Sequence, residues 1–196
     1  LRNDIVKSFV RALGLYDQYT SLHSEEVAFL SLEISKRLKL GPIQTNRIYW
    51  SAVVHDIGKI GIKDTILNKV EPLTKDELTT IQEHAIHGYD ILSKSKGLEE
   101  VASRVRHHHE RWDGAGYPDQ LKGKEIPLCS QILTVCDAVS AMMKDRSYSK
   151  AKTPDEIIGE LYTQKGKQFS PSVANVMIDY IRETGLEKVY NLDLDL

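Results

Sequence analysis

The chain has seven histidines, and the chemistry it can perform depends on where they lie relative to its carboxylates. They are His23, His55, His84, His87, His107, His108 and His109. Asp137 is the most informative carboxylate, because it lies in a largely apolar segment, 132–139, where burial of an unpaired carboxylate costs several kcal/mol. A buried Asp137 therefore requires an arginine, a dense set of hydrogen bonds or a metal ion as its partner.

The positions of His23 and His55 are compatible with a packing role or with a ligand role. His23 begins an apolar stripe at helical spacing, so it faces the core and by itself would be interpreted as a core histidine. His55 lies one turn beyond Ala52 and also points inward, next to Asp56. This pair could simply end a helix, but the glycines of segment 58–61 permit close approach of the backbone to a ligand.

The three consecutive histidines leave a similar choice. On a helix, His108 and His109 are about 100° apart and flank an inward-facing apolar stripe. His107 falls on the other side and is interpreted as a solvated bystander. The run could instead be a polar helix end, where imidazolium suits the helix dipole.

Only one of His84 and His87 is expected to point inward, and we favour His84 because Gly88 indicates a turn of the chain beside His87. Five segments then offer imidazoles and carboxylates at inward-facing positions, a donor set suited to divalent transition metals. Asp56 has two carboxylate oxygens and could bridge two ions. Two ions about 3.5–4 Å apart activate a bridging water and neutralise charge on a phosphoryl group.

A nearly all-helical chain must position these residues. Helices are expected at 3–14, 21–38 and 44–56, over about ten residues from 74, over a stretch ending near 97, at 98–109 and 132–143, from 153, and at 170–185. Thr74 with Glu77, and Thr153 with Glu156, predict capping boxes at two of the helix starts. Loops such as 57–73 and 110–128, which do not fit a helix, are usually functional or mobile in a compact domain.

Composition narrows the class of protein. With 196 residues, 41% of them hydrophobic, the chain is long enough for one sizeable core and too short for two independent domains. Its net charge of −2 disfavours DNA or RNA polymers as partners, and no apolar run approaches the roughly 18 residues that span a membrane. Two cysteines, Cys129 and Cys136, make no disulfide framework and favour a cytoplasmic location. Because residue 1 is not Met, we expect a fragment of a longer chain.

Three segments resemble the motifs of one known family. Residues 55–61, HDIGKIG, match its HD segment; residues 108–118, HHERWDGAGYP, match its GYP segment at every defining position; residues 17–24 resemble its first histidine motif. This is the HD-GYP family, a branch of the HD-domain metal-dependent phosphohydrolases, and the resemblance covers essentially the whole chain. It implies a single all-α domain over 1–196, an HD-domain-like helical bundle with a long Gly-rich loop beside a metal centre.

The resemblance also implies a site, residue by residue. The implied metal ligands are His23, His55, Asp56, His84, His108, His109 and Asp137. The implied catalytic residues are Asp56 and Lys59, with Lys59 near the phosphate. The implied substrate contacts are Lys59, Gly114, Gly116, Tyr117, Pro118, Arg146 and Lys150. The cofactor is then a pair or trio of divalent metal ions, with iron or manganese favoured and zinc, nickel or cobalt compatible with the donor set.

The implied activity is hydrolysis of cyclic di-GMP, a bacterial signalling nucleotide, to linear pGpG and in some members on to GMP. Hydroxide formed at the metal pair attacks phosphorus in line, while Lys59 and Arg146 stabilise charge on the phosphoryl oxygens. For the leaving-group proton, a metal-bound water and Glu110 are the two candidates. HD-GYP domains commonly follow a sensory or receiver domain, so an upstream regulatory domain and signalling-protein partners are expected.

Four residues of the GYP segment have two interpretations each. Glu110 and Asp113 either orient histidines or fix the loop by hydrogen bonds. Trp112 either packs or stacks on a base, and Tyr117 either contacts a base or anchors the loop. No thiolate ligand is expected, because Cys136 precedes the metal-ligand aspartate and points about 100° away from it on a helix.

Three departures from the family pattern affect the prediction. Some members carry a third-metal glutamate one turn before the first histidine, where this chain has Tyr19, so we predict two metals. Ser140 and Ser149 replace an aspartate and a basic residue where base and phosphate contacts are expected, although Lys150 adjoins Ser149. The alternatives are the same chemistry on another cyclic dinucleotide, a nucleotide-sensing or partner-docking domain with weak catalysis, and a helical bundle with a structural metal.

Overall fold

The computed structural model describes residues 20–145 and 150–190, and these parts are helical apart from loops and one isolated bridge between Lys165 and Phe169. The longer helices are α2 (Thr20–Arg37), α3 (Pro42–Val53), α5 (Lys75–Gln82), α6 (His84–Ser93), α7 (Glu99–Arg106), α8 (Leu128–Met142), α9 (Pro154–Gln164) and α10 (Pro171–Thr184). The short elements are η1 (Ile57–Gly61), α4 (Asp64–Leu67), η2 (Gly123–Glu125) and α11 (Glu187–Tyr190). The all-α prediction is confirmed. Among the described helices, none is long and apolar enough to cross a bilayer.

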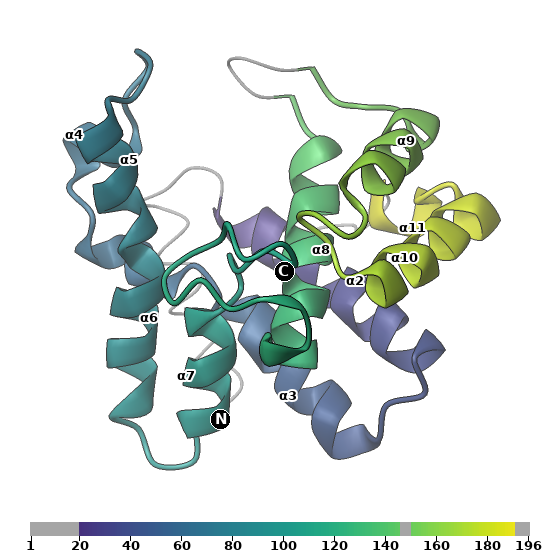
Figure 1. The fold of residues 1–196 in the computed structure, drawn as a ribbon, viewed down its shortest axis with the longest axis horizontal. Coiled ribbons are helices and arrows are strands. Elements are labelled where there is room, and N and C mark those ends of the chain that lie inside the picture. The colour runs from purple at the N-terminus through teal and green to yellow at the C-terminus, as the bar shows by residue number, and fades with distance from the viewer. Residues whose placement is uncertain (1–19, 146–149, 191–196) are drawn as a thin grey trace.

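Helix α8 runs through the middle of the molecule (Figure 1). Helices α2, α3, α7 and α10 pack against it, while α6 pairs with α7 on one side and α9 pairs with α10 on the other. The buried apolar side chains form one core, which includes Leu30, Ile48, Ile132, Val139 and Ile178. A helix surrounded in this way must be apolar on most of its faces, which explains the composition of α8.

Local signals in the sequence place several helix ends. Thr74 and Glu77 form the predicted capping box at the start of α5, and Thr153 and Glu156 form the one at the start of α9. In each box the threonine hydroxyl accepts a hydrogen bond from the glutamate N–H while the carboxylate accepts one from the threonine N–H. Gly185 ends α10 with a φ of 57°, the left-handed conformation that favours glycine.

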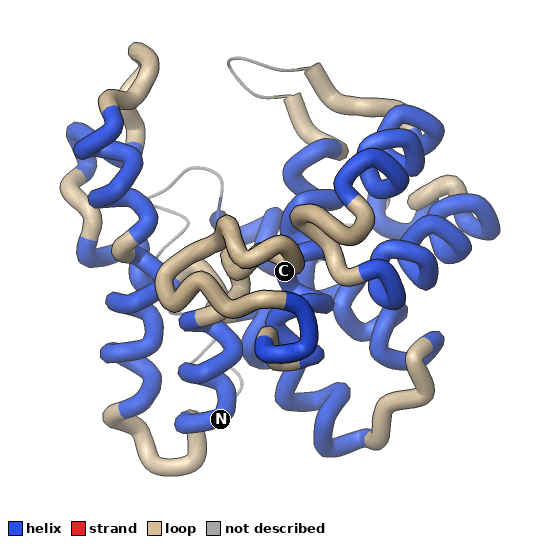
Figure 2. The backbone as a smooth tube through the Cα atoms, viewed as in Figure 1, coloured by secondary structure: helices blue, strands red, loops and turns tan. Residues whose placement is uncertain are grey.

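Several helices end earlier than predicted, and the difference affects the site. Helix α3 ends at Val53 and α7 at Arg106, so 54–56 and 107–109 are turns. The prediction that the histidine run lies on a helix is therefore wrong. Helix α6 continues through Gly88, so the turn predicted beside that residue is also wrong. Between His109 and α8 the chain is the predicted long loop, broken only by η2 (tan in Figure 2). The predicted helix 3–14 lies outside the described residues.

Two glycines allow η1 to pack directly on α6. A Cβ atom added at Gly58 would lie 1.9 Å from the carbonyl oxygen of His84 and 2.4 Å from the N atom of Gly88. One added at Gly88 would lie 2.9 Å from Cγ1 of Val105. Because real atoms do not approach so closely, a side chain at Gly58 would push α6 away. Gly58 thus serves the approach of a helix, not the approach of a ligand as predicted.

Candidate metal centre

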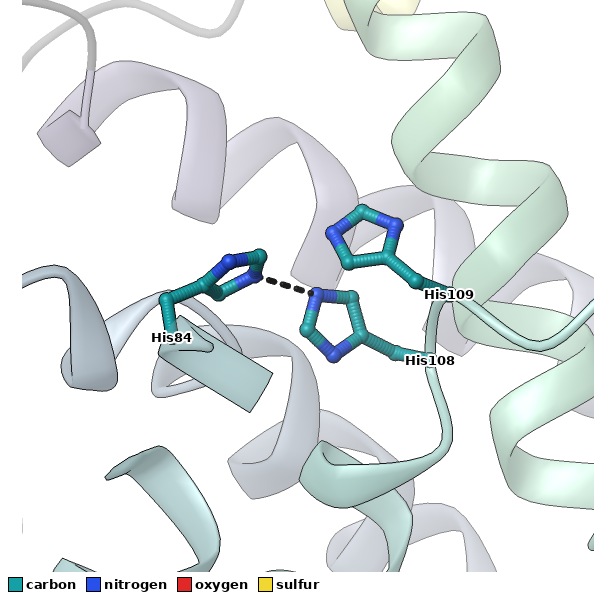
Figure 3. Close-up of side chains that lie close together, drawn as sticks. All are labelled: His84, His108 and His109. Carbon is teal, nitrogen blue, oxygen red and sulfur yellow. Dashed lines mark hydrogen bonds between the residues drawn. The ribbon is translucent and has the colours of Figure 1, made fainter. Parts of the chain in front are cut away.

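The seven side chains predicted as ligands lie together, although they come from five separate segments. Their ligand atoms form three overlapping groups, and within each group these atoms lie within 4.8 Å of one another. The groups are His84, His108 and His109; His23, His55 and Asp137; and His55, Asp56 and His108. His23 comes from α2, Asp137 from α8, and the others from the helix ends and turns around η1 and α7. Figure 3 shows His84 reaching from one side toward His108 and His109 on the other.

The Nε2 atoms of the histidines face one another and the carboxylates. Nε2 of His84 lies 3.4 Å from Nε2 of His108. Nε2 of His23 lies 3.0 Å from Oδ1 of Asp137. The two oxygens of Asp56 face different imidazoles, with Oδ2 3.4 Å from Nε2 of His55 and Oδ1 3.6 Å from Nε2 of His84. Asp56 therefore has the geometry of a carboxylate shared between two groups of imidazoles.

Three of the histidines are held by the same local device. His55, His84 and His108 each lie two residues after the last residue of a helix, namely α3, α5 and α7. The Nδ1 atom of each bonds to the carbonyl oxygen three residues earlier, at 2.7 Å for His55 and 2.6 Å for His84. The last carbonyls of a helix have no partner within the helix and accept such bonds readily. A carbonyl can only accept, so Nδ1 of each ring carries a hydrogen, and Nε2, the atom that faces the cluster, is the one that can bind a metal when the ring is neutral.

Electrostatics favour neutral imidazoles on one side of the cluster. Burial, reinforced by neighbouring imidazoles, lowers the pKa of His108 well below its usual value and that of His109 to about 3. Burial also lowers the pKa of His84. For His55 burial acts in the same direction, but the charge of Asp56 and a hydrogen bond to it outweigh burial and raise the pKa to about 9. Neutral imidazole is the form that binds a metal, so three of these residues are ready to act as ligands.

The carboxylates of the cluster are held in their ionised form. Burial raises the pKa of Asp56, but the charge of Lys59, with Nζ 2.8 Å from Oδ2, and the charge of His55 lower it well below its usual value. Burial acts similarly on Asp137, and the hydrogen bond with His23 lowers its pKa further than burial raises it. Asp137 is half-buried, with 22% of its side chain exposed, and the partner that it was predicted to need is an imidazole in this structure.

The donor set is nitrogen and oxygen, without sulfur. Cys136 is fully buried, and burial raises the pKa of its thiol to about 12, so it stays protonated near neutral pH. Five imidazoles and two carboxylates fit divalent first-row metals such as iron, manganese or zinc. The residues present therefore suit the metal centre that the sequence predicted.

The Gly-rich loop folds back on the cluster. The ring of Tyr117 stacks on the ring of His109, with centroids 4.9 Å apart, and the N–H of Tyr117 bonds to the carbonyl of His109. Gly116 is buried, and a Cβ atom there would lie 2.3 Å from the N atom of Arg111. Gly114 adopts a positive φ of 83°. Of the four loop residues predicted to contact substrate, Tyr117 thus contacts His109, which is a predicted metal ligand.

Glu110 and Asp113 fix the loop. Glu110 is 1% exposed, and its two oxygens accept bonds from the N–H groups of Asp119 and Leu121. Asp113 accepts bonds from Arg111 and from the N–H of Ala115. Of the two interpretations of these acids, loop fixation is the one that their contacts support. With both oxygens engaged in this way, Glu110 is not placed to supply the leaving-group proton.

Trp112 packs within the same loop. A Cβ atom at Gly123 would lie 3.9 Å from its indole ring. The backbone N–H of Trp112 donates to the carbonyl of Gln168, which ties the loop to the segment between α9 and α10. The packing interpretation of Trp112 therefore fits its contacts.

Two histidines lie apart from the three groups. The prediction that His107 is solvated is wrong, since its side chain is 14% exposed and pairs with Asp119 at 2.9 Å. His87 is half-buried, and its ring fits against Gly61, where a Cβ atom would lie 2.6 Å from Nδ1 of His87. The ring of His107 thus contacts the Gly-rich loop through Asp119, and the ring of His87 contacts η1.

Some predicted residues cannot be placed relative to the cluster. Tyr19, Arg146 and Ser149 lie outside the described residues. Lys150 is exposed. The predicted phosphate contacts on this side of the site remain predictions.

Sequence reasoning missed the environment of His23. Ser140, predicted near a base or phosphate, is instead fully buried, and its Oγ lies 2.9 Å from Nδ1 of His23. Glu26 is 5% exposed and accepts a hydrogen bond from the same hydroxyl. The available signal was that Glu26 lies one helical turn after His23, within an otherwise inward-facing stripe.

Comparison with known sequences gives a consistent result. The profile of the family described as "HD domain" matches residues 7–173. A protein of Thermotoga maritima named cyclic di-GMP phosphodiesterase is 37% identical over 91% of this chain and 49% of its own length. A protein of Vibrio cholerae named 3'3'-cGAMP-specific phosphodiesterase 2 is 32% identical over 90% of this chain and 34% of its own length. The chain thus spans about half or less of these relatives.

Comparison with solved structures supports the fold. The crystal structure of a cyclic GMP-AMP phosphodiesterase of V. cholerae (V-cGAP3) superposes with a TM-score of 0.74 at 18% identity. The match covers 96% of this chain and 51% of that chain. At this identity the likeness concerns the fold alone.

Proposed function

This chain belongs to the HD domain family and carries the motifs of its HD-GYP branch, and from this premise we propose that it is a metal-dependent phosphodiesterase that hydrolyses cyclic di-GMP to linear pGpG. The observation that carries the proposal is the position of Asp56, whose two oxygens face imidazoles of two different groups. A shared carboxylate between two sets of nitrogen donors suits two ions close together, and two-ion centres are common in phosphodiester hydrolysis.

The proposed ligands follow from the groups described above. His23, His55 and Asp137 would hold one divalent ion, His84, His108 and His109 would hold the second, and Asp56 would contact both. We propose two ions per chain, with iron or manganese favoured. When bound, the ions supply Lewis acidity that activates water and offsets charge on the phosphoryl group.

The chain's own residues prepare the site for this chemistry. The carbonyl-bound Nδ1 atoms of His55, His84 and His108 keep these rings oriented before any ligand arrives. Lys59 lies at the edge of the cluster with its side chain 22% exposed, so its ammonium can contact a phosphate oxygen. Arg146 and Lys150 are proposed as further phosphate contacts. Tyr117, held on His109, is proposed to border the substrate together with Gly114, Gly116 and Pro118.

A second substrate is a specific alternative, because a relative named for 3'3'-cGAMP is 32% identical to this chain. Ser140 no longer favours this alternative, since it is fully buried and bonds to His23. We also propose a cytoplasmic location and control by an upstream regulatory domain and partner proteins. Both free cysteines, of which Cys136 is buried and Cys129 half-buried, are compatible with a reducing compartment.

The test is turnover of cyclic di-GMP, 3'3'-cGAMP and cyclic di-AMP by protein purified without oxygen, with metal content measured on the same sample. The proposal predicts linear pGpG as the product from cyclic di-GMP and about two ions per chain. Faster turnover of 3'3'-cGAMP than of cyclic di-GMP would identify 3'3'-cGAMP as the substrate and leave the proposed mechanism unchanged. Full metal loading without turnover of any of the three would favour a sensing or docking domain instead.

A further inference from the structure

His23 is held differently from His55, His84 and His108. Its Nδ1 atom faces no backbone carbonyl but the hydroxyl of Ser140, at 2.9 Å. That hydroxyl donates to Oε2 of Glu26 at 2.6 Å, and Oε1 of Glu26 pairs with Nζ of Lys144 at 3.0 Å. His23, Glu26 and Ser140 are each no more than 6% exposed. The contacts form a chain of polar groups leading from a surface-accessible ammonium to a predicted ligand.

The chemistry of these groups gives the chain a direction. A hydroxyl has one hydrogen and can either donate or accept toward an imidazole. A carboxylate paired with an ammonium can only accept, so the hydrogen of Ser140 points toward Glu26. The serine oxygen is then left to accept from Nδ1–H of His23. An ion bound between His23 and Asp137 would take the place of the hydrogen that Nε2 of His23 donates to Oδ1 of Asp137, 3.0 Å away, while the hydrogen on Nδ1 stays in place.

We propose that Glu26 and Ser140 are positioning residues that fix the ring hydrogen of His23 on Nδ1 and thereby set the affinity of the ion held by His23, His55 and Asp137. The proposal rests on the proposed metal centre. It assigns Glu26 a role that carbonyl oxygens play for His55, His84 and His108. A serine alone could not do this, because its hydroxyl could equally well donate to Nδ1 and leave the hydrogen on Nε2.

The first variant is Glu26→Gln. The ammonium of Lys144 attracts the amide oxygen, so the amide N–H faces Ser140 and donates to its hydroxyl. The hydroxyl of Ser140 then donates to Nδ1 of His23 instead of accepting from it. His23 then carries its hydrogen on Nε2, where it blocks the metal. We expect the affinity for one of the two ions to fall about ten- to a hundredfold, as for other groups that orient metal-bound histidines, while the second ion binds as in the unmodified protein.

The measurement is calorimetric titration of metal-free protein with Mn²⁺, together with the Tm of the metal-free form. Glu33→Gln is the matched control, since Glu33 lies on the same helix and pairs with Lys36 away from the centre. The control should bind both ions unchanged. A Tm of metal-free Glu26→Gln close to that of the control would show that the loss of affinity does not come from unfolding.

A second pair of variants keeps the inference testable if Glu26→Gln folds poorly. Ser140→Asp alone places a second carboxylate against Glu26. Because the two negative charges repel, we expect weak binding of the ion held by His23, His55 and Asp137. In the double variant Ser140→Asp with Glu26→Gln, the introduced carboxylate would accept from Nδ1–H of His23 and from the introduced amide. Recovery of affinity to within about threefold of the unmodified protein supports the proposal. No recovery above the single variants contradicts it.

The outcomes separate this inference from the proposed function. If the unmodified protein binds no more than one Mn²⁺ ion and hydrolyses no cyclic dinucleotide, the proposed metal centre fails and the positioning role fails with it. If the unmodified protein binds two ions and Glu26→Gln binds both with unchanged affinity, only the positioning role is overturned.

Discussion

The two sides of the centre hold their histidines by different means. On one side, His55, His84 and His108 follow helix ends and bond to the carbonyl oxygen three residues earlier. On the other side, His23 lies within α2 and bonds to Ser140, which bonds to Glu26. A carbonyl cannot be replaced by mutation and cannot donate, so the first side depends on backbone packing alone. The second side depends on two side chains, so single substitutions can change its metal affinity without changing the fold.

The largest expected effect comes from Asp56, whose two oxygens face one imidazole of each proposed ion site. Asp56→Asn keeps the shape of the side chain but removes the charge shared by His55 and His84. We expect metal content to fall from about two ions to fewer than one per chain, with turnover reduced to background. Elemental analysis and a hydrolysis assay on the same sample measure both. Asp90→Asn, at an exposed position of α6, is the control and should leave both unchanged.

Asp137→Ala should affect only one of the two proposed ions. It should remove the ion of the His23 group and turnover together. Full metal content in Asp137→Ala would show that the assigned ligand set is incorrect.

The backbone-held side should be broken by a methyl group. Gly58→Ala would place Cβ 1.9 Å from the carbonyl oxygen of His84, so α6 must move and His84 must move with it. We expect destabilisation by about 1–3 kcal/mol or more and weaker binding of the second ion. Denaturant unfolding of the metal-free protein measures the first effect. Gly159→Ala, where no atom lies within 4 Å of the added Cβ, should stabilise α9 by up to about 1 kcal/mol.

The loop should separate substrate binding from metal binding. Glu110→Gln replaces one of two buried acceptors by a donor, which opposes the N–H of Asp119 or Leu121. We expect a loss of about 1–3 kcal/mol of stability and a raised KM for the dinucleotide, with metal content retained. Glu71→Gln, at an exposed position, serves as the control. Loss of metal together with the change in KM would contradict this separation, because it would show that metal binding also depends on the loop.

The smallest effect concerns the outer anchor of the loop. Hydrogen bonds from Arg106, and also from His107, lower the pKa of Asp119 from 3.8 to about 2, although burial opposes them. A carboxylate with a depressed pKa stabilises the folded state above about pH 4, and this contribution is lost as the pH falls toward 2. Because the side chain is 34% exposed, we expect Asp119→Asn to cost less than about 1 kcal/mol at pH 7. Unfolding curves of both proteins should converge between pH 4 and pH 2; a difference that persists at pH 2 would contradict the assignment.

Much of this arrangement could be predicted from the sequence. Motifs mark the segments that supply five of the seven side chains, whereas His84 and Asp137 lie outside them. The capping boxes at Thr74 and Thr153 follow from local hydrogen-bonding rules that need no tertiary information. The all-α class follows in the same way from apolar periodicity.

The remainder depends on packing that periodicity does not report. A helical pattern continues through His55 and His108 because the side chains still face inward, but the backbone has already left the helix, and that change creates their carbonyl bonds. The role of Gly58 depends on a helix more than twenty residues away in the chain. Ser140 was misassigned to the substrate because its partners, His23 and Glu26, lie more than a hundred residues earlier.

The most direct test of the central claim is electron paramagnetic resonance of the metal-free protein reloaded with Mn²⁺. If Asp56 joins two ions, the loaded protein should show the spectrum of an exchange-coupled manganese pair, and Asp56→Asn should lose that coupling. A spectrum of isolated Mn²⁺ ions in the fully loaded, unmodified protein would contradict a shared carboxylate and, with it, the two-ion centre.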